Sequence, residues 1–299
     1  MTVFLSVVLP VLLIFGAGYI IQLVARLDIK SLATITLYIM LPNLVFNTFY
    51  EAELDKEYVV MLIFAAVLLI AILLINKIVA KLRNYDQAME SGMILSTAFM
   101  NSGNYGTPII LFAFGKEAFT YAVSFMVLQA IIMNFFGVYY AARGSAGIKL
   151  AFKSVLKMPP TYAVIIALVM NLGSIPVPDS LLSAITLVGD ATIPTMMITL
   201  GMQLAEITVK NMNWVKISYG ATVRLLASPL IAYLLTLVLP MDPLMAKVMI
   251  VAAACPSAAT TTMYALQFDA KPELVSSITL VTTLLSIITL PILLILLGA

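Results

Sequence analysis

Interruptions in the hydrophobic pattern of this chain recur at a fixed spacing. Pro42 lies within one apolar run and Pro194 lies within another, 152 residues further along. The same offset of 152 residues carries Asn104, in a polar break, onto Pro256, in a second break. If each half of the chain holds an odd number of membrane spans, the second half enters the bilayer inverted. Inverted repeats with paired interrupted helices are typical of secondary transporters that bind their substrate near the bilayer midplane.

The composition restricts the class of protein. Of the 299 residues, 63% are hydrophobic and 10% are charged, which is too few charges to cover a soluble domain. A helix needs about 20 predominantly apolar residues to cross a bilayer. Ten segments fit this description: 3–25, 31–50, 57–80, 86–114, 117–142, 157–174, 179–206, 211–239, 243–268 and 272–298. We expect an all-α polytopic membrane protein with ten transmembrane helices, arranged as two inverted five-helix repeats.

One polar, glycine-containing stretch separates the two halves. It begins at Arg143 and continues to Lys157, and it interrupts the apolar pattern. The sequence therefore predicts a first five-helix repeat over 1–143, a cytoplasmic linker over 144–156 and a second, inverted repeat over 157–299. The ranges 1–143 and 157–299 both contain 143 residues, which supports the repeat independently of the prolines.

Basic residues predict the orientation, because cytoplasmic loops carry an excess of lysine and arginine. With an extracytoplasmic N-terminus, the cytoplasmic side holds twelve: Arg26, Lys30, Lys77, Lys81, Arg83, Arg143, Lys149, Lys153, Lys157, Lys210, Lys216 and Lys271. The other side holds three: Lys56, Lys116 and Lys247. We expect a multi-pass protein of the cell inner (plasma) membrane with both termini extracytoplasmic.

Several kinds of site are disfavoured by the residues themselves. The chain has no histidine, and its one cysteine, Cys255, can form no intramolecular disulfide. The basic residues fall between apolar runs and form no patch for nucleic acid. We expect no metal, no cofactor and no nucleic-acid partner. An intramembrane enzyme is disfavoured, because Cys255 has no evident base and the spans hold no paired carboxylates.

The two breaks are the candidate substrate site. Pro108 removes a helical hydrogen bond, and backbone groups freed in a membrane must be buried in protein or line a cavity. Each break starts a second half-helix whose positive dipole end is a ready anion site. If the fourth and ninth helices cross, both ends meet near the midplane. The candidate binding residues are Asn101, Ser102, Gly103, Asn104, Tyr105, Thr107, Pro108, Cys255, Pro256, Ser257, Thr260 and Thr261. The alternative is a pair of proline kinks whose polar residues satisfy only one another.

The second and seventh spans add further candidates. Their prolines could be simple kinks, or they could widen the helices so that Asn43, Asn47, Thr195 or Thr199 face the substrate. Asp190 and Arg224 are the ionisable residues deep within spans, where a charge is expensive and usually paired or functional. Three roles remain open for them: a mutual ion pair, Arg224 as countercharge for an anionic substrate, and Asp190 as a proton-coupling carboxylate.

Four segments together resemble the auxin efflux carrier family in its short prokaryotic form, over the whole chain. They are Leu41-Pro-Asn-Leu-Val-Phe46, Asn101-Ser-Gly-Asn-Tyr-Gly-Thr-Pro108, Gly189-Asp-Ala-Thr-Ile-Pro194 with Leu200-Gly-Met-Gln203, and Ala254-Cys-Pro-Ser257. The resemblance implies two inverted five-helix repeats, crossing broken helices 4 and 9, and transport of organic anions such as malate, malonate or auxin. It also implies that spans 1, 2, 6 and 7 form one unit, and the remaining spans the unit that bears the crossover. Related folds favour a homodimer.

The resemblance also bears on the coupling ion. The fold is similar to that of the bile acid sodium symporters, which use an acidic residue in the second crossover as a sodium ligand. Here the range Cys255 to Gln267 contains no carboxylate, which disfavours sodium and leaves proton coupling open. We therefore expect a secondary carrier of small organic anions that works by alternating access, as a symporter or a uniporter. A passive anion channel or facilitator is the alternative.

Overall fold

The computed structural model describes residues 4–52, 56–142, 145–206 and 213–299, and every regular element within them is a helix. Seven of these helices are long and apolar enough to cross a membrane: Leu5–Ala25, Ile29–Tyr50, Lys56–Leu82, Ser102–Ala142, Asp179–Glu206, Trp214–Val238 and Pro272–Leu296. The bent pair Gly147–Leu156 and Pro159–Leu172 makes an eighth if it is one span. The predicted all-α membrane protein is confirmed at this level, whereas ten spans and an inverted repeat stay predictions.

Two of the three missing continuous spans are explained by the breaks, and the third, predicted over 157–174, is the 14-residue α9 (Pro159–Leu172). The predicted span 86–114 begins as α5 (Gln87–Ala98), and the predicted span 243–268 is divided into α14 (Pro243–Ala253) and α15 (Thr260–Gln267). Each of these pieces is shorter than the roughly 20 residues that cross a bilayer. The second half of the first broken segment merges with the predicted fifth span in α6 (Thr107–Ile132), which kinks at Gly115. Gly115 has φ +81, a backbone conformation that favours glycine.

The other helices follow the predicted segments closely. A π-helical turn, Phe4–Val8, leads into α1 (Leu9–Ala25), and a second, Thr36–Met40, joins α2 (Ile29–Ile35) to α3 (Leu41–Tyr50). The first half continues with α4 (Lys56–Leu82), and a π-helical turn, Met133–Gly137, joins α6 to α7 (Val138–Ala142). The second half contains α9 (Pro159–Leu172), α10 (Asp179–Asp190), α11 (Thr192–Glu206), α12 (Trp214–Thr222), a π-helical turn Val223–Ala227, α13 (Ser228–Val238) and α16 (Pro272–Leu296).

Local sequence explains where several helices begin. Pro42 and Pro194 lie inside the spans Ile29–Tyr50 and Asp179–Glu206, where the α-helical pattern is interrupted: a π-helical turn ends just before α3, and Ala191 separates α10 from α11. Asp86 caps α5 by accepting from the amide of Met89, and Asp242 caps α14 in the same way. The residues predicted as a linker form a further helix, α8 (Ser145–Leu156), and residues 143–144 lie outside the described ranges.

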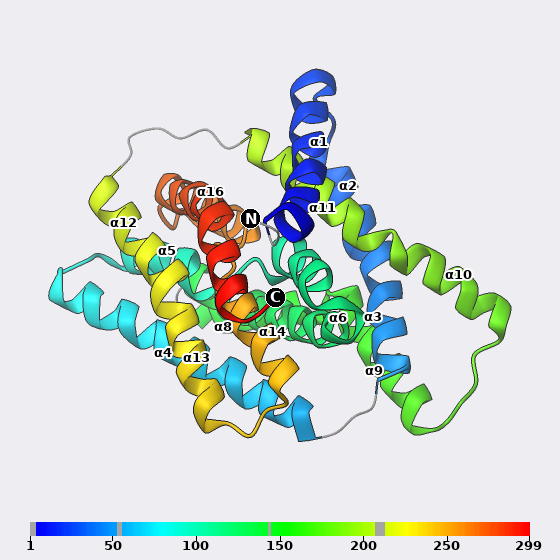
Figure 1. Cartoon of the computed structure of the whole chain (residues 1–299). Coiled ribbons are helices and arrows are strands. Elements are labelled where there is room, and N and C mark those ends of the chain that lie inside the picture. The colour runs from blue at the N-terminus through cyan, green and yellow to red at the C-terminus, as the bar shows by residue number, and fades with distance from the viewer. Residues whose placement is uncertain (1–3, 53–55, 143–144, 207–212) are drawn as a thin grey trace.

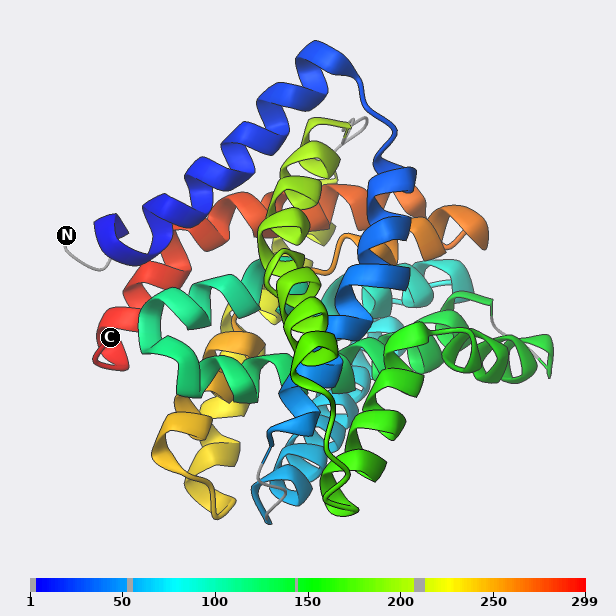
Figure 2. The same cartoon turned by 90° about the vertical axis from the view of Figure 1, so that its right-hand side faces the viewer.

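The helices form two groups (Figures 1 and 2). In Figure 1, α1, α2, α3, α9, α10 and α11 lie on one side, and α4, α5, α12, α13, α14 and α16 lie on the other. Within the first group, a Cβ on Gly18 of α1 would lie 2.2 Å from the carbonyl oxygen of Ile198 in α11, so these two backbones touch. Asn171 of α9 donates its side-chain amide to the carbonyls of Tyr50 and Ala52 at the end of α3. This grouping agrees with the division that the family resemblance implies.

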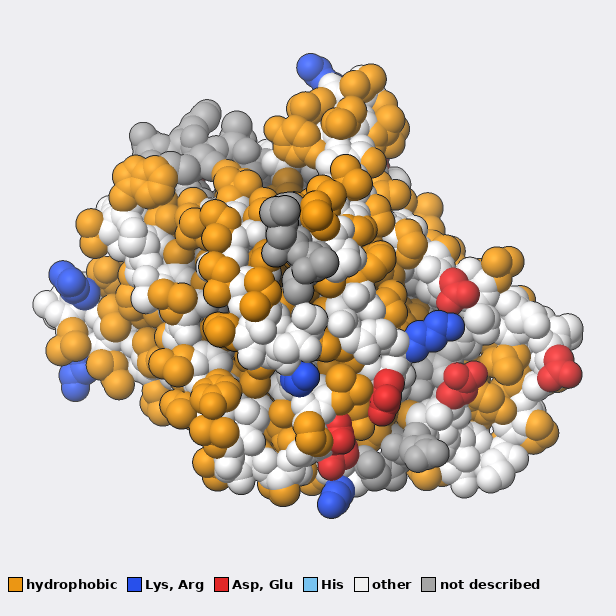
Figure 3. All heavy atoms as spheres, viewed as in Figure 1, with side chains coloured by type: hydrophobic (Ala, Val, Ile, Leu, Met, Phe, Trp, Pro, Cys, Tyr) orange, Lys and Arg blue, Asp and Glu red, His pale blue; other side chains and the backbone are white. Residues whose placement is uncertain are grey.

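The surface is that of a membrane protein. Hydrophobic side chains are spread over the whole face drawn in Figure 3, and the charged side chains on it are few. Val24, Leu187 and Val238, on three different helices, are 77%, 75% and 81% exposed. So large an apolar surface would be unstable in water, and a bilayer accounts for it.

Candidate functional site

The two breaks meet in the structure. Met100 and Ser257 form an antiparallel bridge between them. The backbone amide of Asn101 donates to the carbonyl of Pro256 at 2.8 Å, and that of Ala258 donates to the carbonyl of Phe99 at 3.0 Å. The prediction that the breaks come together is therefore confirmed, and main-chain hydrogen bonds hold them.

Each break frees a carbonyl at the end of its first half-helix. In a continuous α-helix, Asn101 would donate to Thr97 and Ser257 would donate to Ala253. The amide of Asn101 is used across the crossing instead, and the amide of Ser257 donates to the Thr282 hydroxyl at 3.2 Å. The carbonyls of Thr97 and Ala253 consequently need other donors, because an unpaired buried carbonyl is costly.

Arg224 supplies a donor to both freed carbonyls. Its Nη1 donates to the carbonyl of Thr97 at 2.8 Å, and its Nη2 donates to the carbonyl of Ala253 at 2.5 Å. Nη2 also donates to the hydroxyl of Ser228, which in turn donates to Ala253 at 2.9 Å. Arg224 has no exposed surface. A buried cation therefore lies between the C-terminal, negative dipole ends of α5 and α14.

Arg224 does not pair with Asp190. Asp190 is exposed at the end of α10, and the guanidinium bonds just described go to two carbonyls and a hydroxyl. The hypothesis of a mutual ion pair is wrong for this structure. The depth of a residue along its span, which is what the sequence gives, does not determine which neighbouring helix it faces.

Helix α16 supports both breaks through residues that the sequence analysis missed. The Thr279 hydroxyl donates to the Ser257 hydroxyl at 3.3 Å, and Thr282 accepts from the Ser257 amide. The Ser286 hydroxyl donates to the Tyr105 hydroxyl at 2.8 Å. Residues 279, 282 and 286 lie on one face of a helix, so a polar stripe at this spacing in an apolar span was the available signal.

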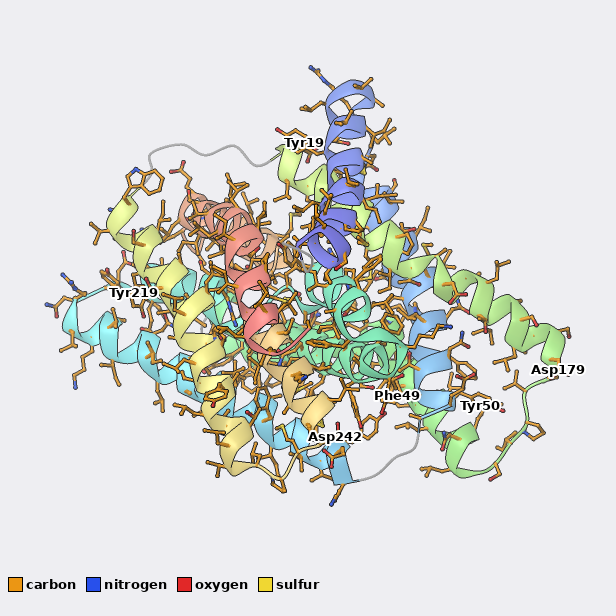
Figure 4. The ribbon with its side chains drawn as sticks, viewed as in Figure 1. Tyr19, Phe49, Tyr50, Asp179, Tyr219 and Asp242 are labelled. Atoms are coloured by element: carbon orange, nitrogen blue, oxygen red, sulfur yellow. The ribbon has the colours of Figure 1, made fainter. Side chains whose placement is uncertain are left out.

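A polar chain runs from α12 towards the first break. Tyr219, labelled in Figure 4, donates its hydroxyl to Asn76 Oδ1 in α4 at 3.2 Å. The Nδ2 of Asn76 donates to the hydroxyl of Thr97 at 2.8 Å, and the carbonyl of Thr97 is the one that Arg224 holds. Asn76 and Thr97 are both buried, so this chain holds the end of α5 in addition to Arg224.

The start of the second half-helix retains free donors. The π-helical turn Ser102–Gly106 leads into α6, and the first amides of a helix have no intrahelical acceptor. Among the described residues, the Nδ2 of Asn101 is buried without a hydrogen-bond partner. Asn104 is partly exposed beside it, and Thr260 is exposed at the start of α15. These groups can donate to the oxygens of a carboxylate, whereas the hydroxyl of Thr107 already donates to the carbonyl of Ser102.

Glycines permit the close packing around the crossing. A Cβ on Gly106 would lie 2.8 Å from the Sγ of Cys255, so the two breaks fit together only because residue 106 lacks a side chain. A Cβ on Gly103 would lie 3.0 Å from the Cε of Met196, which belongs to α11. Helix α11 of the first group therefore covers the first break.

The remaining candidates have hydrogen-bond partners outside the two breaks. The Nδ2 of Asn43 donates to Ile39 in its own helix, and that of Asn47 donates to Thr186 of α10 at 3.1 Å. Thr195 and Thr199 likewise donate within their own helix. Asp190 lines a shallow surface hollow with other residues of α10: Asp179, Leu182, Ser183, Thr186 and Leu187. Within the described ranges, no three His, Cys, Asp or Glu side chains are grouped as metal ligands would be.

Comparisons with known proteins agree on one family. A sequence profile described as "Membrane transport protein" matches residues 3–150 and 145–294. An uncharacterized transporter of Methanothermobacter thermautotrophicus is 27% identical over 297 residues, which is 95% of each chain. An uncharacterized transporter of Methanocaldococcus jannaschii is 26% identical over 299 residues, covering 95% of this chain and 96% of its own.

Proposed function

Because this chain belongs to the membrane transport protein family, which includes the auxin efflux carriers, we propose that it is a secondary active transporter of small organic anions. The substrate class is mono- or dicarboxylates, similar to malate, malonate or auxin, bound where the two breaks meet. The observation that carries this proposal is the buried guanidinium of Arg224, which holds the two freed carbonyls of the crossing.

The electrostatics of the crossing favour an anion. Four half-helix ends lie around it. Two end in carbonyls that have no partner within the helix, and two begin with amides that have none. Arg224 occupies the carbonyl ends, and the free amides are accompanied by the side-chain amides of Asn101 and Asn104. Neither break contains an acidic residue. An anion at the amide ends therefore meets donors and a net positive field.

The two groups of helices support a proposal of alternating access. We propose that the first group (α1 to α3 and α9 to α11) moves relative to the group that carries the crossing. Met196 covers the first break, and the ring of Phe15 in α1 lies 5.3 Å from the ring of Tyr105. Separation of these contacts would open the site to one side of the membrane.

The finer architecture belongs to the same proposal. We propose ten spans in two inverted repeats, with each broken segment counted as one span and α6 divided at Gly115 into two. The kink at Gly115 supports this division, because it separates the half-helix after the first break from the helix that follows. The distribution of basic residues supports extracytoplasmic termini in the cell inner membrane. A homodimer remains part of the proposal.

Uptake by proteoliposomes tests the function. The purified protein is reconstituted, and radiolabelled mono- and dicarboxylates are offered with no gradient, with a proton gradient and with a sodium gradient. We expect accumulation of at least one carboxylate above its equilibrium level under a proton gradient. Uptake that only equilibrates, at a rate proportional to concentration, would indicate a channel. No movement of any carboxylate would reject the proposal.

A variant connects uptake to the crossing. Asn104→Ala removes a partly exposed amide beside the free half-helix start and should raise the KM for uptake. Thr34→Ala is the matched control, because Thr34 is exposed on α2 and donates within its own helix. Equal KM values for the two variants would place the substrate elsewhere.

A further inference from the structure

Helix α8 carries two exposed stripes of different chemistry. The apolar stripe consists of Ile148, Phe152 and Leu156, which are 50%, 57% and 61% exposed. The basic stripe consists of Lys149, Lys153 and Lys157, each one residue further along and each exposed. Residues four apart lie on the same face of a helix, so the two stripes run side by side along α8. Residues 145–157 contain no acidic side chain.

The other face of α8 is fixed to the protein. Ala151 has no exposed surface, and Gly147 is buried close to the carbonyl of Tyr139. The helix does not continue into α9, because the two are bent by 53° at the break between them. Two exposed lysines within α8, and a third directly after it, also make α8 a poor membrane-spanning segment. Helix α8 thus presents a fixed apolar and basic surface that is largely exposed, although the ring of Phe152 also lies 5.0 Å from that of Phe135.

We propose that α8 is an interfacial helix that binds anionic phospholipid headgroups on the cytoplasmic side of the membrane. A helix with adjacent apolar and basic stripes lies in the interface, with its apolar side chains in the acyl boundary and its lysines at the phosphates. Lysines near an anionic surface strengthen binding by about fivefold each. The absence of acidic residues from 145–157 gives the segment the charge that complements such a surface.

A hydrogen-bond chain connects α8 to the crossing. The Ser154 hydroxyl donates to Asn134 Oδ1 at 3.2 Å, and the Tyr264 hydroxyl donates to the same oxygen at 2.8 Å. Tyr264 belongs to α15, the half-helix that follows the second break. A Cβ on Gly137 would lie 3.3 Å from the Tyr264 ring, so the ring packs closely against this part of the chain. Lipid bound to α8 consequently stabilises the position of α15. This effect on transport rests on the proposed function, whereas lipid binding does not.

Fluorescence quenching tests the lipid contact without any measurement of transport. Trp214 is the one tryptophan of the chain. Trp214→Phe with Phe152→Trp places a single reporter on the apolar stripe. Vesicles of phosphatidylcholine contain either dibrominated phosphatidylglycerol or dibrominated phosphatidylcholine at the same mole fraction. We expect stronger quenching by the brominated phosphatidylglycerol. Substitution of Lys149, Lys153 and Lys157 by Gln should abolish that preference.

A charge-matched control separates a specific contact from general attraction. Lys30, Lys81 and Arg83 are exposed and predicted to be cytoplasmic, and their joint substitution by Gln should leave the preference intact. Equal quenching by the two brominated lipids, in the protein that keeps Lys149, Lys153 and Lys157, would overturn the proposal. Quenching of the tryptophan at position 152 by aqueous acrylamide but by neither lipid would also overturn the proposal, because it would indicate a surface for a soluble partner.

The connection to α15 has its own test. Tyr264→Phe removes the hydrogen bond to Asn134 and keeps the ring. It should retain the quenching preference but lose any stimulation of carboxylate uptake by phosphatidylglycerol. Stimulation that persists in Tyr264→Phe would overturn the connection. A protein that shows the lipid preference but transports no carboxylate would reject the proposed function and leave the lipid site standing.

Discussion

Replacement of Arg224 is the most informative perturbation of this protein. Arg224→Met keeps the length and apolar stem of the side chain but removes every donor. The carbonyls of Thr97 and Ala253 then lose their charged partner inside the protein, and the Ser228 hydroxyl still donates to Ala253. A buried polar group left unsatisfied costs about 1–3 kcal/mol. The two carbonyls together therefore cost up to about 6 kcal/mol.

Part of this cost is offset. Burial of a guanidinium without a carboxylate partner carries a desolvation penalty of several kcal/mol, and its removal relieves that penalty. The Ser228 bond also keeps Ala253 partly satisfied. We expect Arg224→Met to lower the free energy of unfolding by about 2–4 kcal/mol. Arg224→Lys retains the charge but its compact ammonium does not reproduce the fork of two nitrogens, so it should lose about half as much.

The substitution of Arg224 by Met should also weaken the binding of an anionic substrate. If an anion binds about 8 Å from the guanidinium at an effective dielectric constant of about 20, the lost attraction is about 2 kcal/mol, or roughly thirtyfold in Kd. Arg224→Lys keeps most of this attraction. The two variants should therefore differ more in affinity than in stability. Arg224→Lys is partly destabilised but still binds the anion, whereas Arg224→Met is destabilised and binds it weakly.

Two measurements on the same samples check this expectation. Unfolding titrations in mixed micelles give the free energy, and calorimetric titration with the best carboxylate from the uptake panel gives the Kd. Ser228→Ala is the control, because it removes one hydroxyl and keeps the guanidinium, and it should cost about 0.5–1.5 kcal/mol with an unchanged Kd. A stable Arg224→Met protein with normal affinity would refute both roles of the guanidinium.

Further predictions concern packing and pH. Gly106→Ala should lower the melting temperature, because its Cβ would lie 2.8 Å from Cys255 Sγ. A second substitution, Cys255→Ala, should restore much of the loss, and no rescue would mean that the strain lies elsewhere. Gly201→Ala should prevent stable folding, since its Cβ would lie 2.0 Å from the Phe15 carbonyl, whereas Gly16→Ala, with nothing within 4 Å, should be tolerated in the same expression assay. The amide of Met89 and then the Lys271 ammonium lower the pKa of Asp86 below its ordinary value of 3.8. The contribution of Asp86 to stability is thus complete above pH 3.8 and lost as the pH falls through its folded pKa, so Asp86→Asn should reduce the acid dependence of unfolding.

The breaks and their meeting could be predicted because their signals are local. Clusters of Gly, Pro and small polar residues inside apolar runs favour a break in the helix, and the shared offset of Asn104 and Pro256 indicates that the two breaks correspond. The donors to the freed carbonyls could not be predicted in this way. Arg224 lies more than a hundred residues from Thr97 in sequence, and the packing of α12 and the π-helical turn Val223–Ala227 against α5 brings them together.

Other differences have the same origin. Asn43 and Asn47 lie beside a proline, as substrate-facing residues often do, but the rotation of α3 turns Asn47 towards Thr186 of α10. The linker was identified by its charge and glycines, yet its lysines recur every four residues and fit the helix that forms there. Local composition indicates where the chain changes direction, and the rotation of each helix about its axis depends on the whole bundle.

The crossing is held by the backbone, and this has a consequence for how such proteins diversify. The bonds from Asn101 to Pro256 and from Ala258 to Phe99 use only main-chain groups, which every residue type except proline can donate and every residue type can accept. Most substitutions at these positions would therefore leave the join intact. Side chains around it that are not closely packed can change with the shape and charge of the substrate, so one architecture can acquire new specificities without first losing its ability to fold.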